Sequence, residues 1–66
     1  MSKLSRWLNR VAGVPEVRLG VKIAEPDYVG LKDRFVTQGI DYGVPGMTAR
    51  ALFDYAARLL GVEVTK

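Results

Sequence analysis

The spacing of apolar residues predicts a helix at each end of the chain. Between residues 2 and 12 the apolar side chains recur at intervals of three, one and three, so one helical face would carry Leu4, Trp7, Leu8 and Val11. A stronger helical pattern runs from Thr48, the expected N-cap, to Leu60. Its apolar stripe would consist of Ala49, Leu52, Phe53, Ala56, Leu59 and Leu60. Gly61 is expected to end this helix in the left-handed conformation.

A strict alternation between the two helices predicts a strand over residues 16–24. Val17, Leu19, Val21 and Ile23 would face one side, and Glu16, Arg18, Lys22 and Ala24 the other. Gly20 lies within this strand, where it would mark a bulge or the close approach of another backbone. Residues 62–65 are predicted to form a second short strand, which we expect to pair with residues 17–23.

The pattern is weaker between the strand and the last helix. Asp27 would cap a short helix over 27–37, although residues 34–38 also suit a short strand. Residues 39–47 hold three glycines and a proline, so they predict a loop with a short extended piece around Tyr42.

These elements indicate a small single α+β domain over residues 1–66. Its order would be helix, strand, helix, helix, strand, with a two-stranded sheet packed by helices. A chain of this length buries a modest fraction of its surface on folding, and the sequence has no Cys for a disulfide. We therefore expect association with a protein partner or a second copy to contribute to stability.

Charge is concentrated near the N-terminus. The chain has 10 Lys and Arg against 7 Asp and Glu, a net charge of +3, and the excess falls in residues 1–22. Lys3, Arg18 and Lys22 are the candidate nucleic-acid contacts, with Arg6 and Arg10 extending the same patch. A solvated basic face is the commoner explanation of such residues, and residues 38–47 are too long for the usual turn of a helix-turn-helix.

The residue types leave little room for catalysis. The absence of His and Cys removes imidazole bases, thiolate nucleophiles and common zinc ligands. The carboxylates Asp33, Asp41 and Asp54 lie in different segments. Asp54 is expected to form exposed ion pairs with Arg50 and Arg58, which lie four positions away on each side. We expect a non-enzymatic protein that binds no cofactor and no metal.

The basic N-terminal helix has the strongest functional pattern. It could pack on the chain's own core through Trp7, insert into a groove on a partner protein, or lie on a membrane surface. As a partner-binding arm it would use Leu4, Arg6, Trp7, Leu8 and Arg10, while Tyr42 and Met47 would add contacts from the loop.

The opening run Met1-Ser2-Lys3-Leu4-Ser5-Arg6-Trp7-Leu8 resembles the starts of small tailed-phage virion and accessory proteins. This resemblance, which covers about ten residues, implies a minor capsid or tail component. The alternative is a small regulator that binds a host protein or nucleic acid through its basic first third. The chain shows no signal-peptide core and no apolar run of membrane-spanning length, so we expect a cytoplasmic or virion location.

Overall fold

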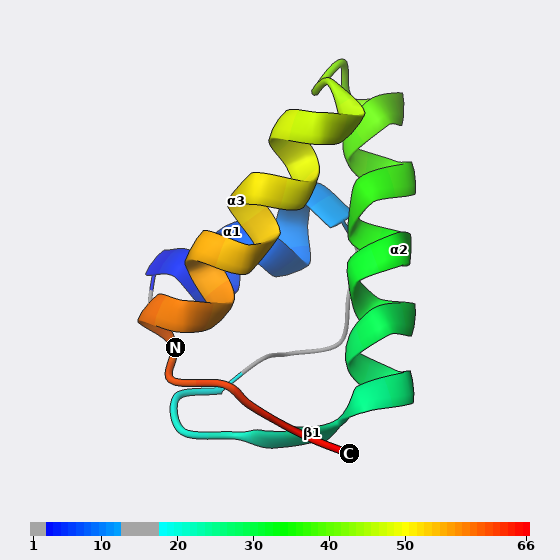
Figure 1. Ribbon diagram of the computed structural model, residues 1–66. Helices are drawn as coiled ribbons and strands as arrows, with labels where there is room; N and C mark the ends of the chain where they lie inside the picture. Colours follow the sequence, from blue (N-terminus) through cyan, green and yellow to red (C-terminus); the bar gives the residue numbers. More distant parts are fainter. Residues whose placement is uncertain (1–2, 13–17) are drawn as a thin grey trace.

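A computed structural model describes residues 3–12 and 18–66, and within the first helix it describes the side chains of residues 6–11. The predicted order of elements is confirmed (Figure 1). The elements are α1 (Lys3–Ala12), β1 (Lys22–Ala24), α2 (Glu25–Asp41), α3 (Gly46–Leu59) and β2 (Glu63–Thr65). The residues on either side of α1, 1–2 and 13–17, lie outside the described part of the chain.

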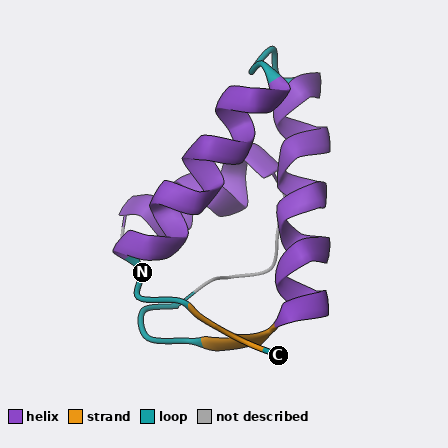
Figure 2. Cartoon of the chain, viewed as in Figure 1, coloured by secondary structure: helices purple, strands orange, loops and turns teal. Residues whose placement is uncertain are grey.

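The sheet has two parallel strands at one end of the helices (Figure 2). Ile23 pairs with Val64, and the neighbouring pairs are Lys22 with Glu63 and Ala24 with Thr65. The chain crosses between these strands through α2 and α3, which form a hairpin. The last strand thus pairs with residues 22–24, which overlap the predicted segment 17–23 only at Lys22 and Ile23.

The long strand predicted over 16–24 is wrong for residues 18–21. Leu19 and Gly20 form a turn, and the Leu19 side chain is 78% exposed instead of buried. Gly20 adopts a φ of 74°, which is costly for a residue with a Cβ. Its N–H donates to the Leu60 carbonyl over 2.8 Å, so the predicted close backbone approach is present in a turn. Residues 16 and 17 lie outside the described part.

The middle of the chain is more helical than the sequence predicted. Helix α2 spans residues 25–41, so the strand alternative over 34–38 and the loop start at Gly39 are both wrong. Ala24 occupies the N-cap position, with Pro26 and Asp27 inside the first turn. Gly39 is buried, and an ideal Cβ placed on it would lie 3.2 Å from the Ala49 Cβ. This glycine allows α2 and α3 to approach each other closely.

Helices α2 and α3 end in the same hydrogen-bonded motif. At the end of α3, Gly61 has a φ of 71°, and its N–H donates to Arg58 while that of Val62 donates to Ala57. Gly43 has a φ of 88° at the end of α2, where it donates to Ile40 and Val44 donates to Gly39. These are Schellman motifs, which satisfy carbonyls at a helix end. The prediction for Gly61 is thus confirmed.

The other end of α3 differs from the prediction. The helix begins at Gly46 with Pro45 as its N-cap, and Thr48 lies inside the first turn. The segment between α2 and α3 is thus Tyr42–Pro45.

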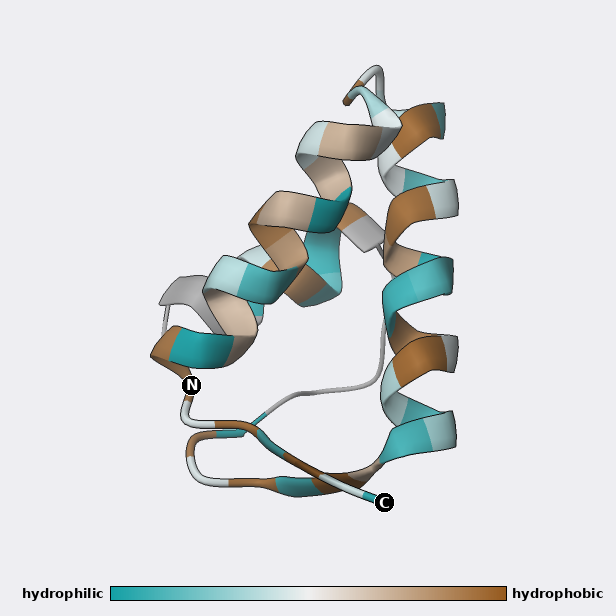
Figure 3. Cartoon of the chain, viewed as in Figure 1, coloured by the Kyte–Doolittle hydropathy of each residue, from teal (hydrophilic) through white to brown (hydrophobic). Residues whose placement is uncertain are grey.

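The core lies where the three helices meet. Its buried side chains are Leu8, Phe35, Val36, Ala49, Phe53, Ala56 and Leu60. Trp7 packs against Phe35 in a tilted arrangement at a ring-centroid distance of 5.5 Å, and Phe35 contacts Phe53 at 5.4 Å. The predicted stripe of α3 is confirmed except at Leu59, which is half exposed. Figure 3 shows that apolar segments recur along all three helices. On α3, hydropathy alone therefore does not distinguish core from surface residues, and the exposed fraction of each side chain does.

Candidate functional site

The first helix packs on the core of the chain itself. Leu8 is 1% exposed, and Trp7 is partly buried against Phe35. The expectation that Leu8 contacts a partner is therefore corrected, because its side chain is already enclosed by its own domain. Trp7 keeps a partly exposed edge, so its predicted role as a contact stays a prediction.

Two further residues of the predicted arm lie on the outer side of α1. Arg6 and Arg10 are exposed and one helical turn apart. Lys3 and Leu4 belong to the first turn of this helix, but their side chains lie outside the described part.

The strand residues of the basic patch are not aligned as predicted. Arg18 precedes the turn at Leu19 and Gly20, whereas Lys22 lies in β1, so they do not share one strand face. The Lys22 ammonium lies 3.8 Å from a Glu63 carboxylate oxygen, and both side chains are largely exposed. This acid offsets part of the positive charge that the sequence assigned to the patch.

Large apolar side chains gather around the segment between α2 and α3. Met47 is 88% exposed and Tyr42 is 70% exposed. The half-exposed Ile40 belongs to the same region, because an ideal Cβ on Gly46 would touch its Cδ1 at 3.4 Å. We call Ile40, Tyr42 and Met47 the turn surface. Tyr42 and Met47 were predicted as contacts, whereas Ile40 was not.

A second apolar group follows the outer side of α3. Met47, Ala51, Tyr55 and Leu59 are each exposed and lie four residues apart. At 3.6 residues per turn they form one continuous ridge, which we call the outer row. The sequence pattern did not point to Ala51 and Tyr55, because the apolar stripe on the buried side of the same helix already accounted for it.

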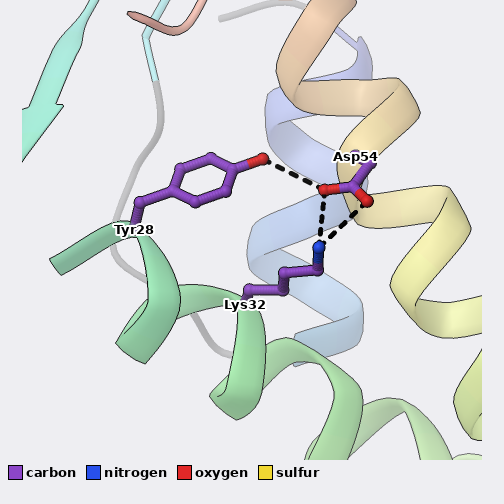
Figure 4. A network of polar contacts seen from close by, with 3 residues as sticks. All are labelled: Tyr28, Lys32 and Asp54. Atoms are coloured by element: carbon purple, nitrogen blue, oxygen red, sulfur yellow. Dashed lines mark hydrogen bonds and ion pairs between the residues drawn. The ribbon is translucent and has the colours of Figure 1, made fainter. Parts of the chain in front are cut away.

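A polar network joins α2 to α3 (Figure 4). The Lys32 ammonium donates to both Asp54 carboxylate oxygens at 2.9 Å, and the Tyr28 hydroxyl donates to one of them at 3.2 Å. Asp54 was predicted to pair with Arg50 and Arg58 of its own helix. That prediction is corrected, because its hydrogen-bond partners come from α2. Their identity depends on the packing of the two helices, which local spacing does not show.

The network shifts the pKa values of Asp54 and Tyr28 in opposite directions. The hydrogen bond from Lys32 is the main cause that lowers the pKa of Asp54, and burial is the main cause that raises the pKa of Tyr28, with Asp54 adding to it. Asp54 is thus held as a carboxylate at neutral pH, already bound by a cation. Such an arrangement fastens two helices together and is poorly suited to a general base.

Comparison with known proteins gives no relative: no family model matches the chain, and neither a curated protein nor a solved structure is significantly similar. Over the residues that the structure describes, every helix is too short or too polar to cross a bilayer.

Proposed function

We propose that this chain is a non-enzymatic interaction subunit of a larger assembly, and that it binds its partner through the turn surface. The observation that carries the proposal is the exposure of Tyr42 and Met47, the former at 70% and the latter at 88%. Exposed apolar residues are common when they are scattered singly. Here three large side chains are grouped around one short segment.

The backbone beneath the turn surface is well ordered by hydrogen bonds. The N–H groups of Gly43 and Val44 both donate over 2.9 Å to carbonyls at the end of α2. Such a fixed segment loses less backbone freedom on binding, so more of the contact energy of its side chains contributes to affinity. Tyrosine and methionine also suit protein interfaces, where aromatic residues and Met are enriched.

A non-enzymatic role is supported by the chemistry of the polar network. Lys32 and Tyr28 occupy the carboxylate of Asp54, and this network connects two helices near the molecular surface. The resemblance of the first residues to phage virion proteins makes a minor capsid or tail component our specific proposal.

A photo-crosslinker placed at residue 42 tests this proposal in the cells that make the protein. The matched control carries the crosslinker at Thr37, an exposed position on α2. We expect a discrete adduct from position 42 that co-purifies with a large particle and is absent from position 37, and mass spectrometry then identifies the partner. Recovery of the chain only as free small protein, with equal crosslinking at both positions, would refute the proposal.

The alternative function is binding to a host protein or nucleic acid through the basic first third, and it is favoured by the exposed pair Arg6 and Arg10. The segment between α2 and α3 is also short enough for a helix-turn-helix, which removes the length argument against one. Figure 1, however, shows α3 folding back beside α2 as a hairpin. Titration with duplex and single-stranded DNA at about 50 mM salt decides this alternative, because contacts to phosphates produce salt-dependent affinity.

A further inference from the structure

Met47 is the most exposed large apolar side chain in the part of the chain that the structure describes, at 88%. It belongs to the turn surface and also begins the outer row. From this placement we propose that Met47 is a modification site, where peroxide oxidises the thioether to methionine sulfoxide and thereby weakens binding through the turn surface. This inference rests on the proposed function, since it concerns the regulation of the same surface.

The oxidation needs one sulfur atom and one peroxide molecule. A lone pair on the Met47 Sδ attacks a peroxide oxygen, so that an S–O bond forms while the O–O bond breaks. With hydrogen peroxide, the proton of the transferred hydroxyl passes to the departing hydroxide, which leaves as water. The sulfur loses two electrons and the peroxide gains them. Sulfoxide reductases reverse the change with two thiols, which become a disulfide as water is released.

The composition of the chain directs this reaction to methionine. Cysteine thiolates are targets of peroxide in proteins, and this sequence has no cysteine. The other two members of the turn surface, Ile40 and Tyr42, contain no sulfur. Met1 is the second methionine of the sequence and lies outside the described residues. The sensitivity of the turn surface to peroxide therefore depends on the sulfur of Met47.

The free protein tolerates a sulfoxide at this position. Oxidation of methionine disrupts a fold when the side chain lies in the core, because the added oxygen is polar. Met47 lies in the first turn of α3 but outside the buried cluster, to which this turn contributes Ala49. The backbone holds the turn, since the Ala49 N–H donates to the Pro45 carbonyl over 2.8 Å. The sulfoxide oxygen thus stays in water and leaves the fold unchanged.

The bound state is sensitive to the same change. A partner that covers the turn surface meets an apolar thioether in the reduced chain and a hydrogen-bond acceptor in the oxidised one. When that acceptor is buried without a donor, the interaction weakens by about tenfold or more. The partner also shields the sulfur from peroxide once it is bound. Oxidation therefore acts on the unbound chain and keeps it from assembling.

Peroxide treatment of the purified full-length chain tests the site itself. Peptide mass spectrometry follows oxygen addition at Met47, with N-acetylmethionine as the reference for an unhindered thioether. We expect Met47 to oxidise at a rate close to that of the reference, and the thermal unfolding midpoint to stay the same by circular dichroism. A much slower rate, or a midpoint that falls on oxidation, would overturn the inference.

The photo-crosslinker at residue 42 tests the effect on binding. The purified chain is oxidised, freed of peroxide and added to a desalted extract of the cells that make the protein. We expect the adduct of the untreated chain to fall by about tenfold or more after oxidation, and to return after treatment with sulfoxide reductases and dithiothreitol.

Met47→Leu is the matched control, because it removes the reactive sulfur and retains Met1. Whatever its starting yield of adduct, that yield should not change on peroxide treatment. A peroxide-dependent loss in this variant would assign the effect to another residue and overturn the inference. Equal adduct from the reduced and oxidised wild-type chains would overturn the inference alone. Absence of any adduct from the untreated chain would overturn the proposed function as well, so the two failures are distinguishable.

Discussion

Two glycines of α2 allow a matched test of how the helices pack. Gly30 is exposed, and a Cβ added there would meet nothing within 4 Å. Gly39 is buried, and its Cβ would lie 3.2 Å from that of Ala49. The same Gly→Ala substitution in one helix thus separates backbone effects from packing.

Gly30→Ala is expected to stabilise the protein, whereas Gly39→Ala is not. Gly30→Ala should raise the free energy of unfolding by about 0.5–1 kcal/mol, because alanine restricts the unfolded chain and favours helix. Gly39→Ala gains a similar term, but it forces a contact that is shorter than ordinary van der Waals distance. Overpacking of a core costs about 1–3 kcal/mol, so Gly39→Ala should be neutral to destabilising by about 2 kcal/mol.

Chemical denaturation of the two variants measures this difference. The total stability of a domain this size is about 3–10 kcal/mol, so a gap of 1–3 kcal/mol between the variants is easily resolved. Ala49→Gly should relieve the contact, so Gly39→Ala/Ala49→Gly should lose less stability than the sum of both single variants. If Gly39→Ala stabilises as much as Gly30→Ala, or if the two single effects simply add, the close approach of α2 and α3 is wrong.

Three further substitutions test the core, the polar network and a helix end. Phe35→Ala removes a buried ring that touches Trp7 and Phe53, so we expect a loss of about 3–5 kcal/mol by urea denaturation, whereas Leu59→Ala on the outer surface should cost under about 1 kcal/mol. Because Lys32 lowers the folded-state pKa of Asp54, its stabilisation is present above the unfolded carboxyl pKa of about 3.9 and is lost as pH falls through the lowered value. Lys32→Met should therefore raise the pKa of Asp54, which NMR titration measures. It should also reduce the loss of stability at acid pH by under about 1 kcal/mol, since the pair is partly exposed. Gly61→Ala places a Cβ at a φ of 71°, so thermal unfolding should show a loss of about 1–2 kcal/mol, with Gly30→Ala as the opposite control.

The sequence predicted the order of elements because each helix and strand leaves a local periodic pattern. The prediction failed where the conformation of a residue depends on a contact with a distant segment of the chain. Gly39 suggested a loop from its own properties, yet its position is set by Ala49 on the next helix. Leu19 fitted a strand alternation, yet the chain turns beside it because the Gly20 N–H meets the Leu60 carbonyl. Both errors concern contacts between segments, which a single sequence does not contain.

The same reasoning explains why the candidate surface was only partly predicted. Helix α3 buries the alanines 49, 56 and 57 and exposes the larger Met47 and Tyr55, the reverse of what side-chain size alone favours. Close packing against α2 requires small residues on the inner side, as the contact between Gly39 and Ala49 shows. Phe53 is the large side chain that this helix buries, whereas Met47 and Tyr55 lie on the outer side, where burial requires another molecule. The fold thus produces its exposed apolar surface as a consequence of its own tight core, and that surface is where we expect assembly to occur.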